Sequence, residues 1–289
     1  MKNQNGKHEK KAGKPSRLGK WLALLPAGCA LLYPLYLAAQ LQTVEKAYIN
    51  HALPRAFHGL KIAYVSDIHW GTFFSDERLQ KLIEQVNALE ADLIVLGGDY
   101  AEDADGALKF WQQKPVFKAK LAALATFGNH DRTLPESHLP RIQRAMRQSG
   151  VIPLVNDVWT LEKEGKILSF AGIDDYYNGH PDLQKVARLC RKADFSVFLP
   201  HSPDVLPQAF ALSDPPFFQL ALCGHTHGGQ VALLGWAPIS SSHLGSRYLS
   251  GWYREKGADI LVSNGVGTSV MPVRFGAAPQ IHLITLQCE

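Results

Sequence analysis

The stretch KIAYVSDIH, residues 61–69, joins a short apolar run to two side chains that can bind a metal ion, Asp67 and His69. Residues 61–65 are rich in β-branched and aromatic side chains, and the polar Ser66 ends the run. This composition is typical of a strand that is buried on both faces of its sheet. The two polar side chains therefore follow the end of a predicted core strand, where open α/β sheets bind their ligands.

Four later blocks repeat this arrangement of an apolar run followed by polar side chains. They are GGD at 97–99, GNHD at 128–131, PH at 200–201 and CGHTHG at 223–228, after the runs 93–96, 124–127, 196–199 and 219–222. Each run is short and bounded by Gly, Pro or polar residues, as strands are. If the five strands lie side by side in one sheet, the blocks meet at its edge. The sequence predicts one site built from distant positions.

Seven side chains in these blocks are candidate metal ligands: Asp67, His69, Asp99, Asn129, His201, His225 and His227. Carboxylate, imidazole and amide oxygen together suit divalent manganese, iron, cobalt or zinc. Seven ligands are too many for one tetrahedral zinc, but they suit two adjacent ions that share a carboxylate, for which Asp99 is the candidate. A single Asp-Xaa-His or Gly-Asp is ordinarily a turn or a cap, so the prediction depends on the ordered set.

The ordered set, together with His130 and Asp131 in the GNHD block, resembles the calcineurin-like metallophosphoesterases over residues 59–287. The phrases CGHTHGGQ (223–230), SRY (246–248) and NGVG (264–267) are similar to those of the bacterial, often membrane-anchored, YkuE/YaeI-type phosphodiesterases. The resemblance implies an α/β fold, a four-layer αββα sandwich of two mixed β-sheets flanked by helices.

The resemblance also implies a division of the ligands between two divalent metal ions, with Mn²⁺, Fe²⁺ or Zn²⁺ as the expected metals. One ion takes Asp67, His69, Asp99 and His227, and the other takes Asp99, Asn129, His201 and His225. His130 becomes the candidate acid or phosphate-stabilising group.

A two-metal site of this kind hydrolyses phosphoesters through a metal-bridged hydroxide. The leaving oxygen benefits from a proton, and an imidazole such as that of His130 is a natural donor near neutral pH. Asp131 is expected in a supporting catalytic role, in which it orients His130 or braces the loop; a salt bridge to Arg132 is an equal alternative. The predicted function is therefore a metal-dependent phosphodiesterase or phosphomonoesterase.

A tyrosinate-iron centre of the purple acid phosphatase type is not expected. Those enzymes place a Tyr ligand three residues after the bridging Asp, and that position here is Glu102. Tyr100 is one residue after Asp99, where strand alternation directs a side chain to the other face.

The amino-terminal residues predict a membrane anchor. Residues 1–20 hold seven Lys or Arg against one acidic residue, and the nineteen residues 21–39 carry no charge. We expect a basic tail (1–20), a transmembrane helix or uncleaved signal anchor (21–39), a connector (40–58) and the metallophosphoesterase domain (59–289). A cleaved signal peptide and a lipid-modified Cys29 are the alternatives. The positive-inside rule predicts a single-pass protein of the bacterial cytoplasmic membrane, whose catalytic domain faces the periplasm or the outside.

The charge of the folded part argues against nucleic acid as a partner. Of 30 basic and 26 acidic residues, the first twenty positions hold seven and one, which leaves 23 and 25 and a net charge of −2 on residues 21–289. Nucleic-acid-binding domains usually carry a basic footprint. The expected partners are the membrane, through residues 21–39, and a phosphoester substrate, for which a lipid-linked one is a candidate.

Two alternative functions belong to the same motifs. One is UDP-2,3-diacylglucosamine pyrophosphatase, which occurs among relatives but acts on the cytoplasmic face. The other is a non-catalytic metal-binding scaffold, which the intact ligand set disfavours.

Several further expectations concern single elements. The pattern after Ser75 predicts a core-facing helix, and residues 139–148 and 181–191 predict two more. Residues 151–154, 159–161, 167–170 and 280–283 predict strands. Arg132, Arg247 and Arg274 are candidate phosphate clamps, Asp174 and Asp175 are candidate acceptors for a metal-bound His, and the aromatic residues in 234–253 suit either a membrane interface or a packed loop.

Overall fold

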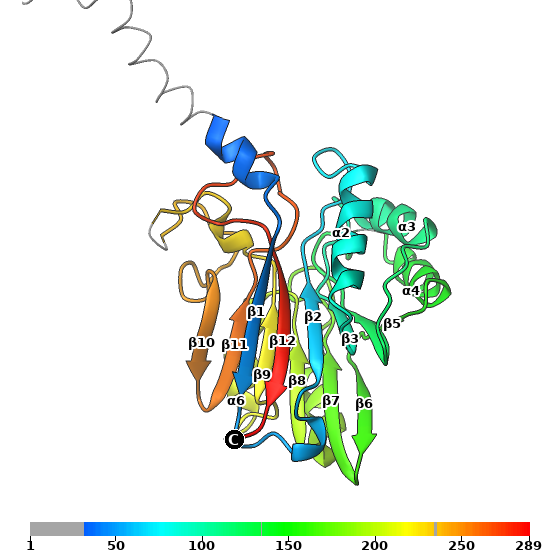
Figure 1. The fold of residues 1–289 in the computed structure, drawn as a ribbon, viewed down its shortest axis with the longest axis vertical. Helices are drawn as coiled ribbons and strands as arrows, with labels where there is room; N and C mark the ends of the chain where they lie inside the picture. Colours follow the sequence, from blue (N-terminus) through cyan, green and yellow to red (C-terminus); the bar gives the residue numbers. More distant parts are fainter. Residues whose placement is uncertain (1–31, 134, 234–235) are drawn as a thin grey trace, which may run out of the picture.

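A computed structural model describes residues 32–133, 135–233 and 236–289, whose strands form two facing six-stranded sheets (Figure 1). The first sheet has the order β1-β12-β2-β3-β4-β5 and the second the order β10-β11-β9-β8-β7-β6. The strands are β1 (Gln42–Ile49), β2 (Lys61–Val65), β3 (Leu93–Leu96), β4 (Ala122–Ala125), β5 (Val151–Pro153), β6 (Asp157–Lys163), β7 (Lys166–Gly172), β8 (Phe195–Leu199), β9 (Leu220–Cys223), β10 (Gly251–Glu255), β11 (Ala258–Val262) and β12 (Gln280–Gln287).

Both sheets are mixed, as the resemblance implies. In the first, β2 to β5 are parallel and β12 is antiparallel to β2. In the second, β7, β8, β9 and β11 are parallel and the outer strands β6 and β10 are antiparallel. The five motif strands do not share one sheet: β2, β3 and β4 lie in the first sheet and β8 and β9 in the second.

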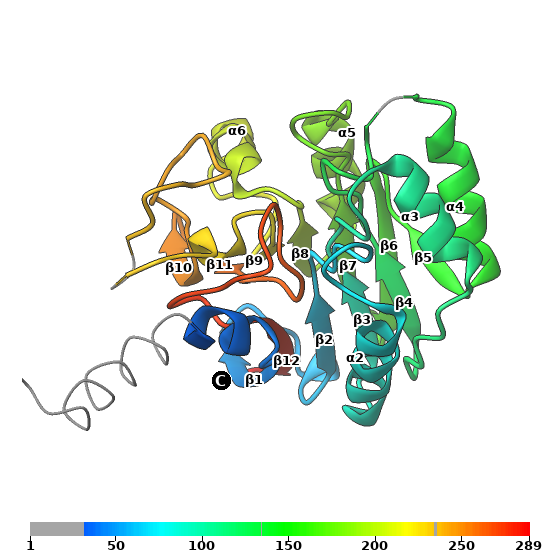
Figure 2. The ribbon, with the colours of Figure 1, turned by 90° about the horizontal axis from the view of Figure 1, so that it is seen from above.

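The alternation of side chains along each strand fills three apolar layers. On β3, Leu93 and Val95 pack between the two sheets, while Ile94 and Leu96 face the helices. The helices α2 (Asp76–Ala88), α3 (Ala104–Gln112) and α4 (His138–Gln148) cover the outer face of the first sheet, and α5 (Leu183–Leu189) and α6 (Leu206–Leu212) cover that of the second (Figure 2). The result is the four-layer αββα sandwich.

The predicted helices and strands are found with small shifts in their ends. The helix after Ser75 is α2, whose first turn is capped by the Ser75 hydroxyl, which accepts a hydrogen bond from Arg78 N at 3.4 Å. The helix expected at 181–191 is shorter, because α5 ends at Leu189 and residues 190–192 continue as a 3₁₀ turn.

The connector expected over 40–58 contains a strand of the domain. Residues 42–49 form β1, which pairs in parallel with β12 from Gln42 opposite Gln280 to Ile49 opposite Gln287. Its sequence gives little sign of a strand, because Tyr48 is its one buried residue, as is usual for an edge strand. The folded unit therefore begins before residue 59.

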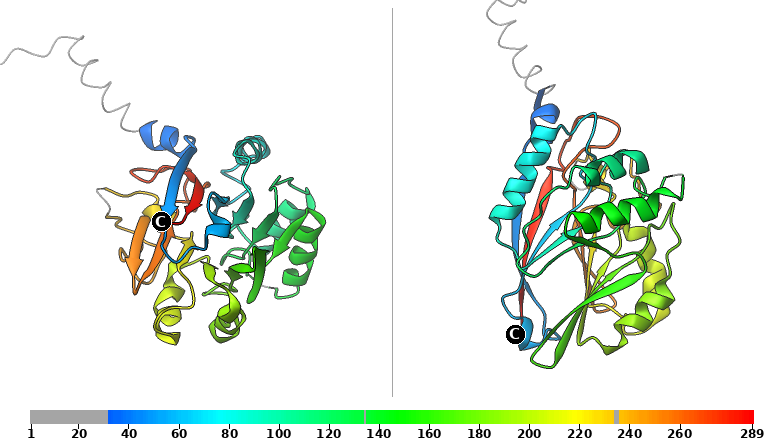
Figure 3. Two further views of the ribbon diagram at one scale, coloured as in Figure 1. Left: turned by 60° about the horizontal axis from the view of Figure 1, so that its bottom comes forward. Right: turned by 90° about the vertical axis from the view of Figure 1, so that its right-hand side faces the viewer.

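Part of the predicted membrane segment lies outside the described residues, which begin at 32. Residues 32–38 are helical and precede β1 (Figure 3), and Arg78 Nη2, from α2, donates to the Ala38 carbonyl at 2.9 Å. Among the residues that the structure describes, every helix is too short or too polar to cross a bilayer.

Candidate metal centre

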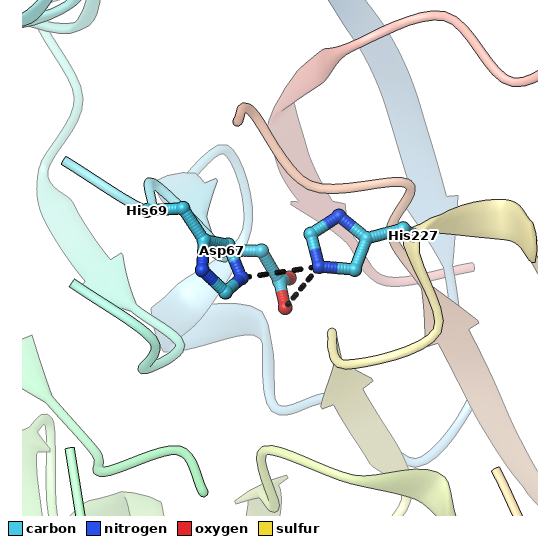
Figure 4. A group of neighbouring side chains, drawn as sticks. All are labelled: Asp67, His69 and His227. Atoms are coloured by element: carbon cyan, nitrogen blue, oxygen red, sulfur yellow. Dashed lines mark hydrogen bonds and ion pairs between the residues drawn. The ribbon is translucent and has the colours of Figure 1, made fainter. Parts of the chain in front are cut away.

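The first group of candidate ligands gathers Asp67 and His69, from the loop after β2, with His227 from the 3₁₀ turn His227–Gly229. Figure 4 shows these three side chains pointing toward one another. The Nε2 atoms of His69 and His227 are 3.1 Å apart, and His227 Nε2 lies 3.8 Å from Asp67 Oδ1. Ligand atoms of all three residues can therefore reach one cation.

The second group gathers Asp99 after β3, His201 after β8 and His225 after β9. His201 Nε2 lies 3.1 Å from Asp99 Oδ2, and His225 Nδ1 lies 2.8 Å from Asn129 Oδ1. The same Asp99 oxygen is 3.7 Å from His69 Nε2, in the first group. All seven predicted residues thus meet where the carboxyl ends of strands from both sheets converge, and Asp99 lies between the two groups.

Hydrogen bonds outside the centre fix which nitrogen faces it. The Nδ1–H group of His201 donates to the Gly97 carbonyl at 2.7 Å, so Nε2 is the nitrogen that faces the centre; burial lowers the pKa of His201, but the Asp99 carboxylate beside Nε2 outweighs this and raises it. His225 is turned the other way: Nε2–H donates to the Ser241 carbonyl at 3.3 Å, so its free lone pair is on Nδ1. Metal-binding histidines are usually held by such a bond from the second nitrogen.

Three buried side-chain atoms of the candidate ligands have no hydrogen-bond partner in the described part of the chain. They are Asp67 Oδ2, His69 Nδ1 and His201 Nε2. Native proteins rarely leave buried acceptors unpaired, and divalent cations are the usual partners of carboxylate oxygens and imidazole nitrogens in such positions. The donor set therefore fits divalent metal ions.

Burial keeps three of the imidazoles neutral. It lowers the pKa of His69 to about 3 and that of His225 to about 4, and it holds the pKa of His227 well below its ordinary value. Burial alone would raise the pKa of Asp99, but the neighbouring His201 outweighs it, and the pKa stays well below the ordinary value. Neutral imidazole and ionised carboxylate are the forms that bind metals.

The backbone at the candidate ligands is unusual. Asp67, His69, Asp99, His225 and His227 all have positive φ, between 47° and 71°. This left-handed conformation is uncommon for residues other than Gly and turns each side chain sharply out of its strand direction. Next to them a Cβ on Gly128 would lie 2.1 Å from Asp99 Oδ1, so only Gly lets the two loops approach this closely.

His130 stands beside the first group at the edge of the centre. Its ring meets that of His69 edge-on with centroids 4.8 Å apart, and its Nδ1–H donates to the Glu102 carbonyl at 2.7 Å. Partial burial lowers the pKa of His130, but the Asp99 carboxylate and the Glu102 carbonyl outweigh this and raise it. The imidazolium form is thereby favoured, with Nε2 as the atom left to donate.

Asp131 is hydrogen-bonded to the backbone of the loops that follow β3 and β4. Its carboxylate accepts hydrogen bonds from the backbone N–H groups of Asp99 at 2.7 Å, Gly128 at 2.9 Å and Tyr100 at 3.0 Å. These contacts correspond to the loop-bracing role, whereas the His130 imidazole is oriented by Glu102.

The three arginines considered as phosphate clamps have other partners. Arg132 forms a buried two-point ion pair with Asp174 at 2.8 and 3.1 Å, and Arg247 pairs with Glu255 on the surface. Arg274 is fully buried and donates to backbone carbonyls. Burial and these partners argue against a clamp role for Arg132 and Arg274, and for the exposed Arg247 the clamp stays a prediction. Asp174, which pairs with Arg132, and Asp175, which accepts from the N–H groups of Tyr177 and Asn178, serve as turn residues rather than as His acceptors.

The structure adds three residues to the surroundings of the centre. The Glu102 carboxylate lies 3.7 Å from His69 Nδ1, the Tyr177 ring stacks on His225 with centroids 5.0 Å apart, and Ser241 Oγ donates to the His225 carbonyl at 2.8 Å. Glu102 could have been found from its position three residues after Asp99. Tyr177 and Ser241 lie in irregular loops that give no local signal.

Comparisons with known proteins agree with this geometry. Residues 60–229 match the family model described as calcineurin-like phosphoesterase. The uncharacterized metallophosphoesterase YkuE of Bacillus subtilis (strain 168) is 32% identical over 91% of this chain and 92% of its own. Phosphodiesterase YaeI of Escherichia coli (strain K12) is 30% identical over 78% and 81%, and a transmembrane protein with metallophosphoesterase domain of Danio rerio is 29% identical over 92% and 62%. The chain belongs to the calcineurin-like phosphoesterase family, whose members are metal-dependent hydrolases of phosphoric esters.

Proposed function

We propose that this chain hydrolyses a phosphodiester with two divalent metal ions. The observation that carries the proposal is the position of Asp99 between the two ligand groups, 3.1 Å from His201 and 3.7 Å from His69. Asp67, His69, Asp99 and His227 would hold one ion, and Asp99, Asn129, His201 and His225 the other. Preference for a diester is supported by the phosphodiesterase similar to 78% of the chain.

The side chains have two roles: one set would bind the cations, and His130 would donate a proton. Bound divalent cations supply the positive charge that neutralises the phosphoryl oxygens and activates water for attack. Asp67 and Asp99 provide the anionic charge that holds the cations, and Gly97 and Ser241 hold two of the imidazoles in the ligand tautomer. His130, whose pKa is raised, donates a proton from Nε2 to the departing oxygen.

We also propose that residues 21–39 anchor the chain in a membrane with the catalytic domain outside the cytoplasm. The uncharged run of nineteen residues after a basic tail supports the anchor, and so does the similarity of 92% of the chain to a transmembrane protein of Danio rerio. Manganese, ferrous iron or zinc would suit the nitrogen and oxygen ligands.

The test is metal-dependent turnover by the full-length chain in detergent. The protein is treated with chelator and assayed with bis-p-nitrophenyl phosphate and p-nitrophenyl phosphate while manganese, zinc or magnesium is restored. The proposal expects diester cleavage that returns with metal, is lost in Asp99→Asn and is retained in Asp105→Asn, which makes the same charge change on the surface of α3. Metal-independent cleavage, or full activity of Asp99→Asn, contradicts it.

A further inference from the structure

Three segments without an exposed charge meet at the end of the molecule that carries the metal centre. They are residues 32–36, Leu233 with residues 236–239, and residues 270–275, which together we name the apolar rim (Figure 1). The Arg274 N–H donates to the Pro34 carbonyl at 3.0 Å, the Tyr33 ring meets the Phe275 ring at 5.8 Å, and the Ala232 N–H donates to the Phe275 carbonyl at 2.7 Å. The rim is therefore one continuous surface.

The rim exposes most of the large hydrophobic side chains that face solvent. Of sixteen such side chains in the described residues, ten lie in the rim, and the other six are scattered over distant elements. The most exposed are Val270 at 84%, Ile239 at 79%, Leu32 at 64% and Trp236 at 63%. Concentrated exposure of this kind marks an interaction surface, whereas single exposed hydrophobic residues do not.

The rim is tied directly to the proposed metal ligands. The Phe275 N–H donates to the carbonyl of Gln230, which follows the turn that holds His227, and Gln230 Nε2 donates to the Met271 carbonyl at 3.0 Å. The loop with Trp236 returns at Ser241, which hydrogen-bonds to His225 at both its carbonyl and its ring. Whatever covers the rim therefore lies beside the metal centre.

The lack of exposed charge and the course of the chain indicate that a lipid bilayer is the partner that covers the rim. Residues 32–44 and 231–242 carry no charge, and residues 265–279 carry only Arg274, which is buried. The uncharged sequence continues backwards from the rim through residues 21–31, and a basic tail precedes it. Exposed Tyr36 and Trp236 are the amphipathic aromatic residues enriched at membrane interfaces.

We infer that the apolar rim inserts into the interfacial region of a lipid bilayer and holds the metal centre at the level of the phosphate headgroups. A consequence is that the substrate is a phosphodiester carried by a membrane lipid, and this consequence rests on the proposed function. Tyr248, also in the aromatic-rich segment 234–253, is buried in the apolar layer outside the second sheet, as the packed-loop alternative expects.

The rim is tested by depth-dependent quenching in the full-length chain with Cys29 and Cys288 changed to Ser. The other cysteines, Cys190 and Cys223, are buried and do not compete for label. A fluorophore is attached at Trp236→Cys, at Val270→Cys or at the control Val116→Cys, which is exposed far from the rim. Vesicles of phosphatidylglycerol and acyl-brominated phosphatidylcholine are expected to quench the labels at 236 and 270 several-fold more than the label at 116. Equal quenching at all three sites, including the case where a second copy of the chain covers the rim, overturns the inference.

A second measurement separates the rim from the chemistry. The triple variant Trp236→Ser, Ile239→Ser, Val270→Ser should keep its turnover of soluble bis-p-nitrophenyl phosphate and lose about tenfold in turnover of a nitrophenyl diester embedded in the same vesicles. The matched control is Val116→Ser, Leu121→Ser, Leu212→Ser, which removes apolar groups elsewhere. Unchanged vesicle turnover by the rim variant overturns the lipid substrate. Failure of soluble turnover in the parent protein, with quenching intact, refutes the proposed function and leaves the membrane surface standing.

Discussion

Arg274 separates two roles, because loss of a phosphate-binding arginine raises the KM for substrate, whereas loss of a buried arginine that hydrogen-bonds to the backbone lowers the stability of the fold. We predict that Arg274→Met destabilises the fold and, because Arg274 Nη2 also lies 3.3 Å from His227 Nδ1, weakens metal retention, while the KM for the diester at saturating metal stays nearly unchanged. The guanidinium is fully buried and donates to the carbonyls of Asn264 at 2.7 Å, Ala277 at 2.9 Å, Gly267 at 3.1 Å and His227 at 3.3 Å.

The size of the effect follows from two opposing terms. Four hydrogen bonds from a charged donor contribute about 6 to 12 kcal/mol together. Burial lowers the pKa of Arg274 to about 9 from the ordinary 12.5, a penalty on the charged form of about 5 kcal/mol, which Met does not incur. The net loss is about 4 kcal/mol, because Met fills space but leaves the carbonyls without donors. For a domain of this size, that corresponds to a melting temperature about 10 °C lower.

The assay is thermal unfolding of the full-length protein and of Arg274→Met and Arg274→Lys, with bis-p-nitrophenyl phosphate kinetics on the same samples. Lys should recover only part of the loss, since an ammonium group cannot reach four carbonyls in the fork geometry of Arg. A Met variant that melts at the same temperature as the parent protein but shows a raised KM for the diester would refute the structural role and favour phosphate binding by Arg274.

Three further predictions concern single features. His130→Gln should retain its metal content and lower kcat by about a hundredfold or more for poor leaving groups, and by less for p-nitrophenolate; kinetics with a leaving-group series decides this, and loss of bound metal would contradict the role. Asp204→Asn should melt below the parent protein at neutral pH, and the gap should close as the pH falls below about 4. Burial raises the pKa of Asp204, but hydrogen bonds from Tyr177 and from the Ser202 and Ser242 hydroxyls lower it overall, so its stabilising contribution exists above the ordinary pKa and disappears in acid; a gap that widens in acid would refute this sign. A chain that begins at residue 46 should melt several degrees below one that begins at residue 40, because it lacks Gln42–Glu45 of β1, which pair with Gln280–Leu283; equal melting temperatures would show that this half of the strand contributes nothing.

The fold could be predicted wherever a local pattern and burial agree. α2 shows a capping Ser75 and apolar residues on one face, and the motif strands are largely apolar, so the sequence predicts both. β1 is an edge strand with mixed burial, and its place is set by β12, a partner about 240 residues away that no local pattern reports. For the same reason the division of the motif strands between two sheets could not come from the strands themselves.

The identities of the candidate ligands could be read from the sequence, but their geometry could not. Asp67, His69, Asp99, His225 and His227 adopt a left-handed backbone that their residue types disfavour, at a cost of order 1 kcal/mol or more for each. Only the packed surroundings hold them there: Gly128 admits Asp99, Asp131 bonds the N–H groups beneath it, and Arg274 ties the carbonyl of His227. Asp131 and Arg274 both resemble catalytic residues in the sequence, because they are charged and adjacent to the motifs. The structure shows why a charged side chain beside a motif need not touch substrate. Where the backbone leaves regular structure, its N–H and carbonyl groups cannot be paired by a neighbouring strand. Here a buried carboxylate and a buried guanidinium form hydrogen bonds with these groups instead.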